Sequence, residues 1–131
     1  MKKLERKDLI YPELSYRVIG CAFDVHNELQ GGHHEKYYQR ALSEAFQRKG
    51  LQYVQQVYFP LEYKGKMVGK NFLDFLVEGK IVVEIKKGDR YSKRHIDQVL
   101  NYLKMSNTKL AILINFGLND VRFKRIINFN S

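Results

Sequence analysis

The segment that most constrains the fold is KLAILINF, residues 109–116, which is almost entirely apolar. A strand whose side chains are apolar on both sides has to be covered on both faces. The segment is also far too short to cross a bilayer, since a membrane-spanning helix needs about 20 apolar residues. We therefore expect a buried strand within a layered domain and no association with a membrane.

The remaining segments supply the layers around this strand. Three stretches carry apolar residues at helical spacing, the last with Ser92 as its cap: 12–30, 34–49 and 92–107. Five stretches have the composition of strands: 51–63, 71–77, 80–86, 109–116 and 121–128. The KGKMVG stretch at 64–69 is turn material, with a short paired strand as the alternative, and Pro60 is expected near an element boundary. This order predicts an α/β or α+β fold with a mixed central sheet flanked by helices.

The charge balance favours a polyanionic partner. The 131 residues, enough for a single domain over 1–131, include 23 Lys and Arg against 14 Asp and Glu, for a net charge of +9. Nucleic acid is the usual partner of such a surplus, and a protein that is merely basic is the alternative. Residues 1–10 are charged with no apolar stretch behind them, so we expect a flexible basic N-terminus rather than a secretory signal. The lone Cys21 cannot form an internal disulfide, and the reducing cytoplasm is the expected compartment.

Three ionisable residues interrupt the apolar runs of the strands at 71–77 and 80–86: Asp74, Glu84 and Lys86. If the two acids face each other, their charges repel unless a proton or a cation lies between them. Carboxylate oxygens in such a pair suit Mg²⁺, which accepts water and substrate phosphate as its other ligands. Lys86 shares a strand face with Glu84 and would orient a water or stabilise charge on phosphorus. The alternative is a solvated face on which Lys86 forms a salt bridge with the acids.

Whether the acids meet depends on the turn between the two strands. A loop of two residues, Glu78 and Gly79, would set Asp74 opposite Val83 and send Glu84 to the other side of the sheet. A loop of three residues would set Asp74 directly opposite Glu84. Both loops are common in hairpins, so both registers stay open.

Further polar residues add to this pattern. Glu35 shares a helical face with Tyr38, although an acid in the first turn of a helix is also explained by the helix dipole. Gln98 and Tyr102 lie one turn apart beside the apolar stripe of the third helix, where an ordinary boundary pair is the alternative. A basic cluster follows Lys86 where phosphates can be met, unless it is a solvated loop: Lys87, Arg90, Lys93, Arg94 and His95. His95 itself is expected to be a boundary residue.

Three motifs occur in a fixed order along the chain: G-x-x-E-x-x-Y (Gly32, Glu35, Tyr38), D…(D/E)-x-K (Asp74, Glu84, Lys86) and Q-x-x-x-Y (Gln98, Tyr102). In this order and spacing they resemble the GxxExxY family within the PD-(D/E)XK nuclease superfamily. The resemblance runs from about residue 12 to 128. The sequence departs from the superfamily pattern at Leu73, where a proline often precedes the aspartate.

The resemblance implies a restriction-endonuclease-like core and an Mg²⁺-dependent nuclease, with Mn²⁺ as a substitute. Asp74 and Glu84 would hold the ion, Glu35 would complete or orient its ligands, and Lys86 would position or activate the attacking water. Other residues would bind nucleic acid or support the site: Tyr38, Gln98, Tyr102, Lys87, Arg90, Lys93 and Arg94. DNA is expected rather than RNA, and a homodimer fits a substrate with two strands. The alternatives are a nucleic-acid-binding module that does not cut, or a protein-interaction scaffold.

Overall fold

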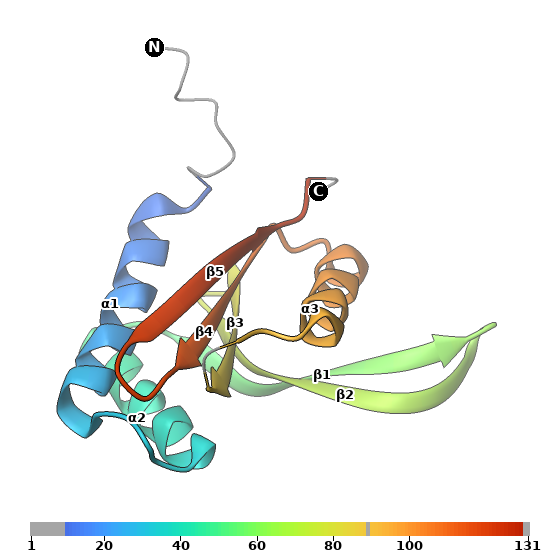
Figure 1. Cartoon of the computed structure of the whole chain (residues 1–131). Helices are drawn as coiled ribbons and strands as arrows, with labels where there is room; N and C mark the ends of the chain where they lie inside the picture. Colours follow the sequence, from blue (N-terminus) through green and yellow to red (C-terminus); the bar gives the residue numbers. More distant parts are fainter. Residues whose placement is uncertain (1–9, 89, 130–131) are drawn as a thin grey trace.

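The computed structural model describes residues 10–88 and 90–129, so the predicted flexible N-terminus falls almost wholly outside the described residues. The elements follow the predicted order (Figure 1): α1 (Pro12–Leu29), α2 (Glu35–Arg48), β1 (Tyr53–Tyr63), β2 (Lys66–Val77), β3 (Ile81–Lys87), α3 (Lys93–Ser106), β4 (Leu110–Phe116) and β5 (Val121–Ile127). Ser92 caps α3 as predicted, because its side chain accepts the His95 N–H. Within the described part of the chain, no helix is long and apolar enough to span a membrane.

The five strands form one mixed sheet in the order β1-β2-β3-β4-β5. All neighbouring pairs are antiparallel except β3 and β4, which run parallel. Parallel neighbours need a long crossover between them, and α3 provides it. The mixed sheet flanked by helices is thus confirmed.

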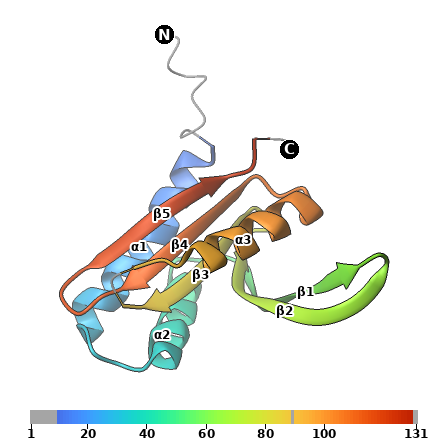
Figure 2. The ribbon, with the colours of Figure 1, turned by 45° about the vertical axis from the view of Figure 1, so that its right-hand side comes forward.

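The sheet is covered on both faces, as the apolar segment at 109–116 predicted. Every residue of β4 is buried. Ile112 and Ile114 pack in the cluster with α1 and α2, whereas Ala111 and Leu113 pack in the cluster with α3. Figures 1 and 2 show the two layers, with α1 and α2 on one side of the sheet and α3 on the other.

The β1–β2 hairpin is longer than predicted and extends beyond the helices (Figure 2). Its turn is confined to Lys64 and Gly65, so most of the expected turn at 64–69 belongs to β2 instead. The prediction that Pro60 lies near an element boundary was also wrong, because Pro60 lies inside β1 opposite Lys70. A proline is tolerated there because β1 is an edge strand, where a missing N–H need not break the ladder.

Candidate active site

The turn between β2 and β3 has three residues, 78–80, and pairs Val77 with Ile81. Of the two registers that the sequence left open, this is the one that directs Asp74 towards Glu84. Both acids therefore lie where β2 and β3 begin to separate, at the end of the short paired region.

Beyond the last backbone pair, Phe75 with Val83, the carboxylates themselves join the two strands. The Asp74 N–H donates to Oε1 of Glu84 over 2.9 Å. The Ile85 N–H donates to Oδ2 of Asp74 over 2.7 Å. Each acid thus accepts a main-chain hydrogen bond from the opposite strand, and the two carboxylates are fixed beside one another.

A break in strand regularity accompanies this arrangement. Leu73 and Phe75 would share a face in a regular strand, yet Leu73 packs on the α3 side and Phe75 on the α1–α2 side. On β1, opposite Asp74, Gln56 has a left-handed backbone with φ of 54°. The alternation of side chains therefore fails at Asp74, and its carboxylate reaches the β3 backbone.

Burial and mutual repulsion disfavour two ionised carboxylates at this place. Glu84 is only 6% exposed. Burial, followed by the charge of Asp74, raises the pKa of Glu84 to about 8. Burial is also the main cause that raises the pKa of Asp74, against the hydrogen bond from Ile85 and the charge of Lys86. Near neutral pH the pair therefore retains a proton, and a bound cation could replace that proton.

The donor chemistry of the pair suits a hard divalent cation. Mg²⁺ is commonly bound through one or two carboxylates and keeps several waters. Glu35 approaches from the start of α2, but its Oε1 accepts the Lys87 N–H over 3.2 Å. No group of three or more His, Cys, Asp or Glu side chains among the described residues is arranged to hold a metal ion. Asp74 and Glu84 are therefore the two residues that suit a divalent cation. The role of Glu35 as a ligand stays a prediction.

Gln39 is a member of the site that the sequence interpretation missed. Its Nε2 donates to Oδ1 of Asp74 over 2.8 Å, which leaves Asp74 held from both α2 and β3. Gln39 lies one turn after Glu35 on α2, and this spacing of four residues was the signal that could have revealed it.

His95, expected as a boundary residue within the basic cluster, reaches the site from α3. Its Nε2 lies 3.9 Å from Oε2 of Glu84. Burial, together with the charges of Lys86 and Arg94, lowers the pKa of His95. The ring is accordingly neutral at neutral pH, so we regard this contact as a polar one rather than an ion pair.

The two predicted tyrosines lie in the core rather than at the carboxylates. Tyr38 is buried, donates its hydroxyl proton to the Gln30 carbonyl over 2.6 Å and stacks on Phe116. Tyr102 is 8% exposed and packs edge-on against Phe59 with ring centroids 5.3 Å apart. Both side chains support the fold around the site.

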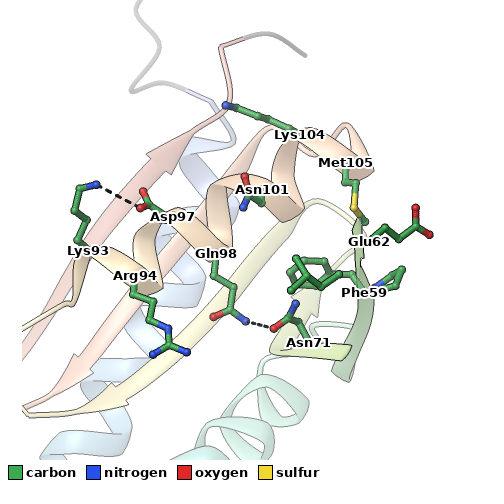
Figure 3. Close-up of a pocket in the computed structure, with 12 residues that line it drawn as sticks. Phe59, Glu62, Asn71, Lys93, Arg94, Asp97, Gln98, Asn101, Lys104 and Met105 are labelled. Atoms are coloured by element: carbon green, nitrogen blue, oxygen red, sulfur yellow. Dashed lines mark hydrogen bonds and ion pairs between the residues drawn. The ribbon is translucent and has the colours of Figure 1, made fainter. Parts of the chain in front are cut away.

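The other predicted residues lie on or near α3. Gln98 donates to Oδ1 of Asn71 over 3.2 Å and so links α3 to β2 (Figure 3). Arg94 lines a hollow that Gln98 and Asn71 also line. Lys93 forms an ion pair with Asp97. The remaining two basic residues are exposed at the end of β3 and in the loop that follows: Lys87 and Arg90.

Comparisons with known proteins agree with the observed fold. A family model described as the PD-(D/E)XK nuclease superfamily matches residues 12–126. A comparison with curated proteins found no match. Among solved structures, the chain is similar to one titled "Crystal structure of SSO0001", with 19% identity and a TM-score of 0.54. The similar region covers 71% of this chain and 49% of that one, so the chain spans about half of that structure. At this identity the likeness shows the fold alone.

Proposed function

Because the chain belongs to the PD-(D/E)XK nuclease superfamily, we propose that it hydrolyses phosphodiester bonds of nucleic acid with a divalent cation held by Asp74 and Glu84. The observation that carries this proposal is the pair of carboxylates bonded to each other's strands. Two buried carboxylates side by side repel when both are ionised, and a bound cation removes that repulsion.

Each neighbouring side chain has a role in this proposal. When bound, a divalent ion stabilises charge on the phosphate and lowers the pKa of a water. Lys86 lies on the same strand face as Glu84 and presents a positive charge to the phosphate and the attacking water. Gln39 holds the Asp74 carboxylate in its orientation. Glu35 ties the start of α2 to the end of β3. In this proposal it would complete or orient the ligands of the ion.

Several finer assignments belong to the same proposal. The GxxExxY branch is supported by Glu35, whose helix start lies at the site, with Gly32 and Tyr38 in the turn before it and on the same helix. Mg²⁺ is the proposed ion, with Mn²⁺ as a substitute, and DNA is the proposed substrate. A homodimer would serve a substrate with two strands. The free and buried Cys21 suits the proposed reducing cytoplasm.

One observation favours a second candidate function, a module that binds nucleic acid without cutting it. Within residues 10–88 and 90–129, no three acidic, histidine or cysteine side chains gather to hold a metal. A site of two carboxylates already satisfied by backbone N–H groups would then be structural, while the basic surface still binds phosphates.

The experiment that separates these functions is a cleavage assay on labelled DNA and RNA strands and duplexes with Mg²⁺ or Mn²⁺. The proposal expects cleavage by the wild type, none by Glu84→Ala and none by Lys86→Ala. Lys124→Ala removes an exposed lysine from β5 and serves as the matched control with normal cleavage. Salt-sensitive binding without cleavage, unchanged in Glu84→Ala, would support the binding module.

A further inference from the structure

A groove of about 930 Å³ runs between α3 and the β1–β2 hairpin (Figure 3). We call it the α3–hairpin groove. Residues 59–62 and Asn71 of the hairpin form one wall. The other wall is the face of α3 that carries the lining residues between Lys93 and Met105. Its volume lies in the range of about 300–1,000 Å³ that small ligands occupy. The groove therefore has a volume comparable with that of a small-ligand site.

Two residues of α3 connect the groove with the surroundings of the carboxylate site. Arg94 and Gln98 line the groove and also a smaller hollow next to His95. His95 in turn lies 3.9 Å from Glu84. A strand whose phosphate lies at the carboxylates can therefore pass His95 and enter the groove along α3.

Amide side chains occur at the middle of the groove. The bond from Gln98 to Asn71 uses one Gln98 donor and the Asn71 acceptor. The carbonyl oxygen of Gln98 and the amide group of Asn71 are left for a further partner. Asn101 adds another amide one turn along α3, on the same side of the helix. Amides are the side chains that pair with the donor and acceptor edges of bases.

Apolar side chains face the same space. Leu61 on the hairpin is 50% exposed, and Met105 on α3 is 58% exposed, although both are large and hydrophobic. Both line the groove together with Pro60. Such surfaces accept the flat faces of unstacked bases, which any strand without a partner presents.

The charges at the edges suit a phosphate backbone. Lys93 is paired with Asp97, but Arg94 lies at the end nearest the carboxylates and Lys104 at the end of α3. A duplex would also bring its phosphates to these cations, but its stacked bases could not place their flat faces on the apolar wall of Leu61 and Met105. The groove thus matches a single strand better than a duplex.

We propose that the α3–hairpin groove binds unpaired bases next to the phosphate held at Asp74 and Glu84. The inference rests on the proposed function and narrows its substrate to nucleic acid with a single-stranded region. Bases at the amides and apolar wall position the strand, and Arg94 guides the phosphate from the groove to the carboxylates.

The test is fluorescence anisotropy with a short labelled DNA strand, an RNA strand of the same sequence and a blunt duplex, all in EDTA so that nothing is cut. Asn101→Trp fills the groove from an exposed position. Asn27→Trp places the same side chain on the exposed face of α1, across the sheet, as the matched control. Met105→Glu, compared with Asn27→Glu, repels the strand without adding bulk and replaces the first variant if that one does not fold.

The proposal expects the wild type to bind one or both single strands more tightly than the duplex. The groove variants should bind single strands about tenfold more weakly, as the loss of one base contact predicts, and the controls should not change. Equal affinity for strand and duplex, or groove variants that bind like the controls, would overturn it. If binding depends on the groove but the protein cuts nothing with Mg²⁺, the proposed hydrolysis is refuted and the groove proposal is supported. Cleavage of the single strand by Asn101→Trp at the wild-type rate would refute the groove and support the hydrolysis.

Discussion

The backbone N–H of Asp74 donates a 2.9 Å hydrogen bond to the carboxylate of Glu84, so the main chain of one acid holds the side chain of the other. The orientation of the pair is therefore set by the β2–β3 backbone. An ion or a phosphate meeting these oxygens finds them already positioned, which lowers the cost of ordering them on binding.

The first prediction concerns stability and pH without metal. The pKa of Glu84 rises from an ordinary 4.5 to about 8 on folding. Below 4.5 both states hold the proton, and between 4.5 and 8 only the folded state does, so the free energy of unfolding falls as the pH rises through this window. Thermal unfolding in EDTA should show Glu84→Gln more stable than the wild type at pH 8, with little difference at pH 5. Glu44→Gln, an exposed acid on α2, is the control, and a wild type that loses no stability over this range contradicts the prediction.

A second prediction concerns Gln39, which we describe as a positioning residue. Gln39→Ala removes the donor that holds Oδ1 of Asp74. Loss of such a supporting hydrogen bond commonly costs about 10–100-fold in metal affinity or activity. Calorimetric titration with Mn²⁺ should show weaker binding, whereas urea unfolding should show little change. The neighbouring exposed Arg40→Ala is the control, and normal metal affinity in Gln39→Ala would mean that Asp74 needs no support from α2.

Much of the fold could be predicted because its local signals agree with its tertiary structure. The apolar segment now seen as β4 demanded cover on both faces, and α1, α2 and α3 supply it. The spacing of apolar residues predicted the helices, and Ser92 predicted the start of α3. At 64–69 the turn was favoured over the paired strand that the structure shows, because the exposed residues of an arm carry no burial pattern from which a strand can be recognised.

The site was predictable only in part, for physical reasons. Asp74 and Glu84 stood out as charges in apolar strands, but their meeting depended on a turn whose two lengths the sequence allowed equally. His95 could not be linked to Glu84 because α3 and β3 pack together only in three dimensions. The two tyrosines of the motifs were expected at the site, whereas in the structure Tyr38 and Tyr102 lie in the core.

A third prediction distinguishes packing from contact at Tyr102. Tyr102→Phe keeps the ring against Phe59 and should change the free energy of unfolding by less than about 1 kcal/mol. Tyr102→Ala leaves a cavity and should cost about 3–5 kcal/mol in urea unfolding. Nucleic-acid affinity of Tyr102→Phe should equal that of the wild type. A stable Tyr102→Phe that binds nucleic acid poorly would show that the hydroxyl touches the substrate.

The most direct test of the carboxylate pair is calorimetric titration of the protein with Mn²⁺ at neutral pH. We predict that the wild type binds the ion and releases a proton from the pair, so the heat depends on the ionisation enthalpy of the buffer. Asp74→Asn and Glu84→Gln should each weaken binding by at least about tenfold, while Glu44→Gln binds normally. A wild type that binds no ion, or a Glu84→Gln variant that binds it as well as the wild type, would contradict a cation site at Asp74 and Glu84.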